Sequence, residues 1–235
     1  LSFKHAGEAN WTAPATLSLA LLTAALWHER AHEQRWARRF AVAALILALA
    51  ISVIAIDSEL PRRVGIEYGY EIDPSARLRG WRTAAEKIDE IRREFEAANG
   101  QPVFLIANKY GTAASLAFYL ADKRVEARGH PPVYVPESAF PENQYYFWPR
   151  YDENEELPPG AVPKDEYYTE ESGVSLFVGR SALYITDRAE ERATSAIKDG
   201  FERVEMIRCI DFERRGLPLR QLRVFACYKY HQRSL

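Results

Sequence analysis

Hydrophobic positions follow two patterns along the chain, continuous near the amino terminus and periodic further on. Residues 9–27 and 40–56 contain no charged side chain. Residues 28–39 between them hold four arginines and two glutamates. Uninterrupted apolar runs of this length are typical of helices that cross a membrane. The pattern therefore predicts a membrane hairpin with spans at about 11–27 and 40–56 and a short basic loop at 28–39.

The second run is the stronger of the two predicted spans. As a helix it would reach about 25 Å, slightly less than the roughly 30 Å hydrocarbon core of a bilayer. The first run is interrupted by hydroxyl and amide side chains and by Pro14. A pair of buried core helices is one alternative, which the lack of a polar face in 40–56 disfavours. A secretory signal is another, which the 39 preceding residues disfavour.

The charge of the short loop predicts the orientation of the hairpin. Arginine-rich loops stay on the cytoplasmic side of a membrane. We therefore expect a multi-pass protein of the inner or plasma membrane, with residues 1–8 and 57–235 outside the cytoplasm. The chain begins with Leu1 and has its single methionine at position 206, so we expect it to be part of a longer protein.

Beyond residue 57 the periodicity alternates between strands and helices. Apolar residues recur at helical spacing from Asp73 to Asn99, and 110–120 and 189–198 are also helical in pattern. Short apolar runs predict strands at 103–108, 132–135 and 182–186, and the tail predicts an antiparallel hairpin with arms 202–213 and 219–230. This order is typical of an α/β layered domain with a mostly parallel sheet and an antiparallel hairpin at its end.

Charge and motif content exclude several functional classes. The net charge is −2 overall, and residues 57–235 carry 26 Lys+Arg against 30 Asp+Glu. A mildly acidic domain of this kind argues against nucleic acid as a partner. Phosphate-binding glycine loops, C-x-x-C pairs and H-E-x-x-H are absent from the sequence, so we expect neither a cofactor nor a metal. Cys209 and Cys227 lie on opposite arms of the predicted hairpin, where a disulfide and two separate thiols both remain open.

The stretch 149–173 is rich in proline and acidic residues and lacks periodicity. A solvated insertion is the default interpretation. A lid over a binding site and a calcium site are the alternatives, although the Asp-x-Asp-x-Asp-Gly order is missing.

Polar groups follow three of the predicted strands. They are Asn108-Lys109-Tyr110, the stretch 143–148 and Asp187-Arg188. Ligands of α/β sheets collect beyond the carboxyl ends of the strands, and amides with aromatic rings suit hydroxyl-rich ligands. The alternative is that the aromatic residues belong to the core and the amides cap turns.

Several segments, in this order, resemble the carboxyl-terminal half of family 39 glycosyltransferases, membrane enzymes related to protein O-mannosyltransferases and the aminoarabinose transferase of lipid A. The segments are EANWTAPA at 8–15, DPSARLRGWR at 73–82, KYGTAASLAFYL at 109–120, NQYYFWP at 143–149, ALYITD at 182–187 and the tail from FERVE at 201–205. The resemblance implies transfer of a sugar from a polyprenyl-phosphate carrier to a lipid, glycan or protein acceptor outside the cytoplasm.

The resemblance also implies roles for individual residues. The catalytic carboxylate of such enzymes lies in their first outer loop, which this chain does not contain, so we assign no catalytic residue and expect the chain alone to be inactive. Leu78-Arg79-Gly80-Trp81 would dock the domain onto the membrane part, or Arg79 would meet lipid phosphate. The resemblance places Glu8, Asn10 and Trp11 in an outer loop near the catalytic cavity of such enzymes. It places five residues of the soluble domain along the acceptor path, namely Tyr110, Asn143, Gln144, Tyr145 and Trp148.

A non-catalytic function is the alternative hypothesis. In that case the chain is a membrane-anchored α/β module that binds a glycan or another partner through 108–110 and 143–148.

Overall fold

The fold is taken from a computed structural model of the chain. The structure describes residues 13–66, 68–70, 73, 75–126, 128–138, 140–153, 175–188 and 193–231. The chain divides into an amino-terminal unit (Leu1–Tyr68 with Asp73–Ser75) and a carboxyl-terminal unit (Gly69–Ile72 with Ala76–Leu235).

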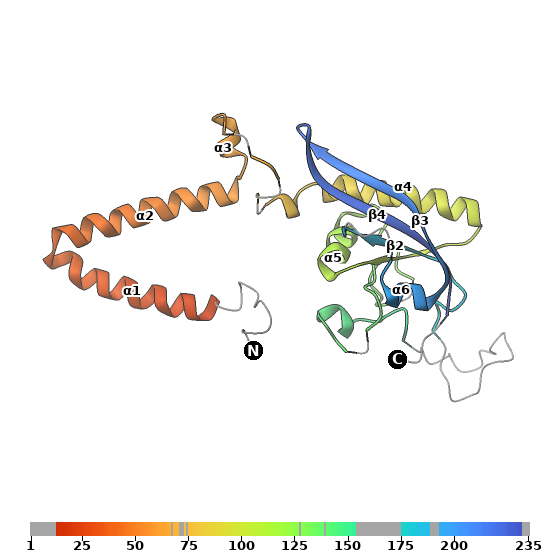
Figure 1. Cartoon of the computed structure of the whole chain (residues 1–235). Helices are drawn as coiled ribbons and strands as arrows, with labels where there is room; N and C mark the ends of the chain where they lie inside the picture. The colour runs from red at the N-terminus through yellow and green to blue at the C-terminus, as the bar shows by residue number, and fades with distance from the viewer. Residues whose placement is uncertain are drawn as a thin grey trace. The chain divides into compact units, whose positions relative to one another are not determined.

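The amino-terminal unit contains a helical hairpin (Figure 1). Helix α1 spans Ala13–Glu33 and α2 spans Arg35–Ile56. Gln34 alone separates them, with φ −129° and ψ 113°. Residues 28–39, predicted to connect the two spans, are therefore helical apart from Gln34, and where each span ends in a membrane stays a prediction.

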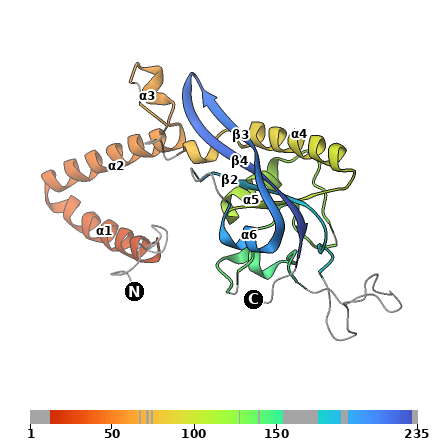
Figure 2. The ribbon, with the colours of Figure 1, turned by 45° about the vertical axis from the view of Figure 1, so that its right-hand side comes forward.

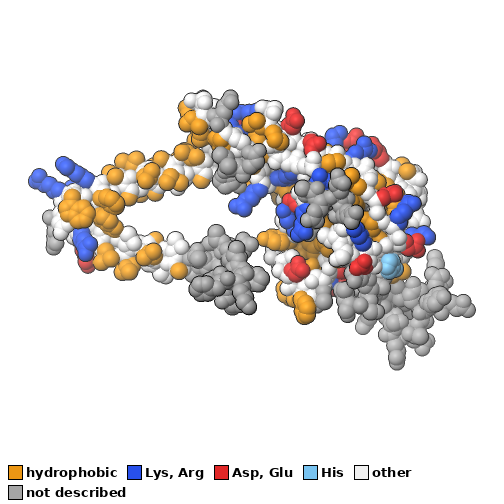
Figure 3. All heavy atoms as spheres, viewed as in Figure 1, with side chains coloured by type: hydrophobic (Ala, Val, Ile, Leu, Met, Phe, Trp, Pro, Cys, Tyr) orange, Lys and Arg blue, Asp and Glu red, His pale blue; other side chains and the backbone are white. Residues whose placement is uncertain are grey.

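Only α2 among the described helices is long and apolar enough to cross a membrane. All of its side chains from residue 42 to 56 are exposed, and Figure 3 shows them as a continuous hydrophobic surface with Lys and Arg at the turn. No described residue of the unit buries these apolar side chains, as expected of a helix that contacts lipid. Helix α1 includes residues 13–27 of the first apolar run but is less apolar than α2, so a second span stays a prediction.

A short segment held by side-chain hydrogen bonds follows α2. Helix α3 (Leu60–Arg63) begins with Pro61 in its first turn. Nearby, the Ser58 hydroxyl donates to the Asp73 carboxylate at 2.8 Å, and Arg62 donates to the Tyr68 carbonyl at 2.7 Å. These contacts join Tyr68 and Asp73 to the segment that directly follows α2.

The carboxyl-terminal unit is built on a four-stranded sheet. The strands are β1 (Phe104–Ala107), β2 (Ala182–Thr186), β3 (Phe201–Arg214) and β4 (Leu217–Tyr230), in the spatial order β1-β2-β4-β3. Figure 2 shows the long β3–β4 hairpin beside α4. The described remainder comprises η2 (Ala76–Leu78), α4 (Trp81–Asn99), α5 (Tyr110–Tyr119), η3 (Gln144–Phe147) and α6 (Ser195–Gly200).

The mixed α/β class is confirmed, but the sheet is mostly antiparallel. Only β1 and β2 run parallel, and β4 pairs antiparallel with both β2 and β3. The predicted strand at 132–135 contributes one bridge, between Ile106 and Tyr134. Pro131, Pro132 and Pro136 flank that bridge, and proline cannot donate the ladder hydrogen bonds that a longer strand needs.

Side-chain alternation along the strands separates two buried clusters. On one face, Leu105 and Ile185 pack with Ile88 of α4 and Leu116 of α5. On the other face, Phe104 and Tyr184 pack with aromatic residues and with Ile197 of α6. Both faces of β1 and β2 are thus covered, which explains why these strands are continuous apolar runs in the sequence.

Helix α4 begins later than the periodicity predicts. Its N-cap is Gly80, in the left-handed conformation with φ 76°. A β-carbon built on Gly80 would lie 2.9 Å from Leu219 Cδ2. Glycine at this position therefore serves both the turn and the close approach of β4.

The hairpin turns at Arg215-Gly216, both with positive φ, as a two-residue turn requires. The observed pairing sets Cys209 opposite Arg223 and Cys227 opposite Val204. The two thiols are free, with Cys209 exposed and Cys227 buried.

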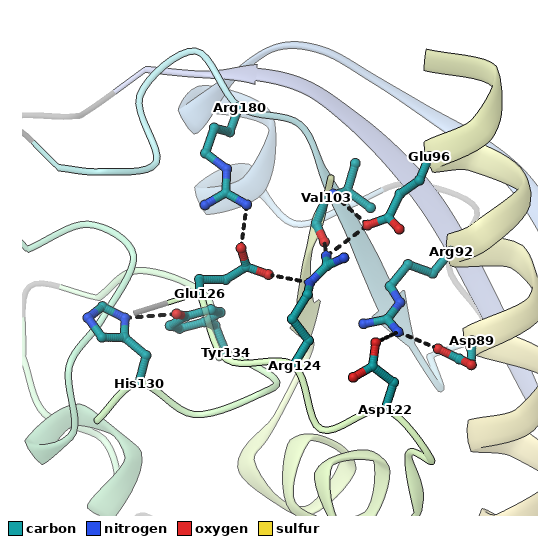
Figure 4. Close-up of polar contacts among 10 residues, drawn as sticks. All are labelled: Asp89, Arg92, Glu96, Val103, Asp122, Arg124, Glu126, His130, Tyr134 and Arg180. Atoms are coloured by element: carbon teal, nitrogen blue, oxygen red, sulfur yellow. Dashed lines mark hydrogen bonds and ion pairs between the residues drawn. The ribbon is translucent and has the colours of Figure 1, made fainter. Parts of the chain in front are cut away.

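A polar network joins three segments at the amino-terminal end of β1 (Figure 4). Arg124 donates to the Glu96 carboxylate of α4 at 2.8 Å, and Glu96 also accepts from the Val103 amide at 2.8 Å. Glu126 pairs with Arg124 at 3.2 Å and with Arg180 at 2.5 Å. The network thereby holds the loop after α5 against α4 and against the segment that precedes β2.

Candidate functional site

The candidate site lies where β1 and β2 end. Because these strands are parallel and in register at Ala107 and Ile185, the residues that follow them meet at one edge of the sheet. The backbone N–H of Asn108 donates to the Ile185 carbonyl at 2.9 Å, which extends the β1–β2 ladder by one hydrogen bond. The side chains of Asn108, Lys109 and Asp187 therefore converge.

Asp187 is the centre of this edge. Its Oδ1 accepts from Asn108 Nδ2 at 2.9 Å, and its Oδ2 accepts from Lys109 Nζ at 2.5 Å. Burial would raise the pKa of Asp187, but the hydrogen bonds and the charge of Lys109 outweigh burial, so its pKa lies below the ordinary value. The carboxylate is held ionised near neutral pH.

Two side-chain oxygens in the segment that follows β1 are buried without a hydrogen-bond partner among the described residues. They are Asn108 Oδ1 and Thr112 Oγ1, the second in the first turn of α5. A buried unpaired polar atom is costly unless a water or a ligand completes it.

Arginines of β4 approach the same edge from the neighbouring strand. Arg223 donates to the Arg188 carbonyl at 2.6 Å. Burial lowers the pKa of the Arg220 guanidinium below its ordinary value. The negative charge of Asp187 acts in the opposite direction, which indicates that the two side chains are near one another. Neither arginine was predicted from the sequence to lie at this edge, because its position depends on the pairing of β4 with β2.

The remaining described site residues that the sequence predicts lie at the start of α5 and around η3. Tyr110 is the first residue of α5 and is 51% exposed. Asn143 caps η3 by accepting from the Tyr145 amide at 2.9 Å. Tyr145 is only 6% exposed and belongs to the core, with the ring of Trp148 4.7 Å from its own.

The stretch 143–148 thus follows largely the alternative interpretation, in which an amide caps a turn and an aromatic ring fills the core. Gln144 and Trp148 remain exposed, Trp148 at 47%. Among the described residues, no hydrogen bond joins this stretch to Asn108, Lys109 or Asp187. Glu8, Asn10 and Trp11 lie outside the described residues, as does most of the proposed lid at 149–173.

The chemistry of the edge favours binding over proton transfer. A general base works best with a pKa near the working pH, whereas the pKa of Asp187 is lowered and both of its oxygens accept hydrogen bonds. The described residues contain no group of three or more His, Cys, Asp or Glu side chains placed to hold a metal ion. An amide, a carboxylate and an ammonium group together suit recognition of hydroxyl groups.

Comparison with protein-family models, curated proteins and solved structures finds no match to this chain.

Proposed function

We propose that this chain is the carboxyl-terminal part of a membrane glycosyltransferase that transfers a sugar from a polyprenyl-phosphate carrier to an acceptor outside the cytoplasm. The single observation that carries the proposal is the polar edge of Asn108, Lys109 and Asp187 in a unit that follows an apolar helix. The ordered sequence resemblance supports the reaction class.

In this proposal the edge positions the acceptor. Asp187, whose side chain is partly exposed, accepts a hydrogen bond from an acceptor hydroxyl. Lys109 keeps Asp187 ionised. The catalytic base and the donor site lie in the part of such enzymes that the resemblance does not cover.

The test uses the complete gene in a host strain from which that gene is deleted. Asp187→Asn should raise KM for the acceptor by about tenfold, the size expected for loss of one hydrogen bond to a charged group. It should change kcat by much less. Glu205→Gln is the matched control, because Glu205 is an exposed carboxylate that also accepts one side-chain hydrogen bond, from Tyr228.

Two results would contradict the proposal. One is that membranes with the complete protein consume no lipid-linked sugar. The other is that Asp187→Asn behaves like Glu205→Gln.

A membrane-anchored binding module is the second candidate. The lowered pKa of Asp187 favours it, because a stable carboxylate suits a binding site that performs no chemistry. Calorimetric titration of the chain in lipid nanodiscs with oligosaccharides separates the candidates. Micromolar binding without any turnover supports the module, and weak binding together with turnover by the complete protein supports the transferase.

A further inference from the structure

One end of the carboxyl-terminal unit is formed by two segments that are far apart in the sequence. They are the loop 76–80 before α4 and the tip of the β3–β4 hairpin. Arg220 joins them, because it donates to the Arg77 carbonyl at 2.8 Å and its guanidinium carbon lies 3.6 Å from the Trp81 ring centre. Trp81 in turn donates to the Arg77 carbonyl at 2.7 Å. The loop is therefore fixed against β4.

The side chains that this end presents to the outside are basic and apolar. Leu78 is 73% exposed, and Leu217 at the tip is also exposed. Arg77 next to Leu78 in the sequence, and Arg214 and Arg215 close before Leu217, are exposed as well. We call Arg77, Leu78, Arg79, Arg214, Arg215 and Leu217 the basic tip.

The charge of this end is opposite to that of the rest of the unit. Residues 76–82 and 211–223 together contain seven arginines and two acidic residues, whereas 57–235 as a whole carries more acids than bases. Lys and Arg side chains gather near the start of α4 in Figure 3. A concentrated basic end on an acidic unit is a directional electrostatic feature.

The backbone of α4 adds to the positive electrostatic potential of this end. Helix α4 has 19 residues and begins at this end, and Gly80 as its N-cap offers no side chain to its first-turn amides. The positive end of the helix dipole therefore acts in the same direction as the arginines. Figure 2 shows the hairpin tip extending past the start of α4.

We propose that the basic tip binds the anionic headgroups of a lipid bilayer, with Leu78 and Leu217 inserted at the interface. Arginines bind phosphate through paired hydrogen bonds, and exposed leucines beside them suit the boundary between headgroups and acyl chains. Residue 76 follows the end of the apolar helix α2 by 20 residues, which span at most about 70 Å when extended. The inference rests on α2 lying in a membrane, which the proposed function also requires, but not on sugar transfer.

The test uses the whole chain in nanodiscs of neutral lipid alone or with about one-third anionic lipid. Leu217→Cys in a Cys209→Ser background takes an environment-sensitive fluorophore, while Cys227 is buried and stays unlabelled. Headgroup spin-labelled lipid should quench the probe strongly in the anionic discs and weakly in the neutral ones. Arg214→Gln with Arg215→Gln should reduce this difference about tenfold.

The control pair is Arg203→Gln with Lys229→Gln, two exposed cations at the other end of the same hairpin. It should leave the quenching unchanged. Equal quenching in both kinds of disc, or equal loss in both double variants, would overturn the proposal. So would a shift of the probe by inorganic phosphate in detergent, because that would indicate a small-anion site. The assay contains no sugar donor or acceptor, so its failure is distinct from failure of the proposed function.

Discussion

Burial would raise the pKa of Asp187, but the contacts with Lys109 and Asn108 lower it, and this makes the stability of the carboxyl-terminal unit dependent on pH. The folded-state pKa of Asp187 is lowered from the ordinary value, so the ionised form stabilises the fold above an unfolded pKa of about 3.9. That contribution is lost as the pH falls through the folded pKa. Lys109→Met should raise the folded pKa of Asp187 and flatten this dependence.

Urea midpoints at neutral and acidic pH, followed by near-ultraviolet circular dichroism, measure the effect. Lys198→Met, in an exposed position on α6, is the control and should keep the wild-type pH dependence. An unchanged dependence in Lys109→Met would show that the Lys109–Asp187 pair does not set the pKa.

Alanine substitutions at Gly80 and Gly100 distinguish the energetic cost of a positive φ from the cost of a close side-chain contact. Both have positive φ, but only a β-carbon at Gly80 would meet a neighbour, Leu219. Gly100→Ala should therefore destabilise the unit by about 1 kcal/mol through its backbone conformation alone. Gly80→Ala should cost about 1–3 kcal/mol more, because Leu219 must shift. Equal urea midpoints for the two variants would contradict the close approach of β4.

At the scale of elements, the ion-pair network of Figure 4 is expected to matter more than exposed pairs. Arg124 is partly buried and serves Glu96, Glu126 and the Val103 carbonyl. Arg124→Gln should destabilise the unit by about 2 kcal/mol, because a partly buried carboxylate loses its partner.

The matched control is Arg208→Gln. Arg208 pairs with Glu94 of the same helix, α4, but both side chains are more than half exposed. Such pairs contribute about 0–1 kcal/mol. Thermal or urea unfolding that shows equal effects for the two variants would mean that the network adds nothing beyond single surface pairs.

Local elements were predictable because each has its own signal. Tyr110–Tyr119 and Ala182–Thr186 match their predicted ranges to within a residue, since continuous apolar runs and turn residues bound them. The strand order was not predictable, because it depends on which edge of β2 the hairpin joins. The apolar run 224–227 in β4 was the available sign that this arm is an interior strand and not an edge.

The site was predictable to the same extent. Asn108, Lys109 and Asp187 come together because two parallel strands end side by side. The stretch 143–148 follows a segment that proline limits to one bridge, so the expectation that it ends at the same edge had no strand to support it. Arg220 became visible only with the strand order.

At the scale of the whole molecule, the orientation in the membrane is a prediction that a native cysteine can test. Cys209 is exposed and Cys227 is buried, so a maleimide that cannot cross membranes reports on Cys209 alone. Export of residues 57–235 predicts labelling of intact spheroplasts without lysis. Cys209→Ser should abolish the signal, and labelling that requires lysis would place the unit in the cytoplasm.

The one-residue connection at Gln34 has a consequence for how the chain enters a bilayer. With α1 and α2 joined so tightly, and with Trp27 stacked on Phe40 at 5.4 Å, the first helix has little freedom to stay behind when the second partitions. A hydroxyl of α1 adds little to the free-energy cost of transfer into lipid where it donates to the helix backbone. Thr23 does so, to the Leu19 carbonyl at 2.7 Å. If the predicted membrane hairpin is correct, this geometry predicts insertion of the two helices as a preformed pair, and not helix by helix.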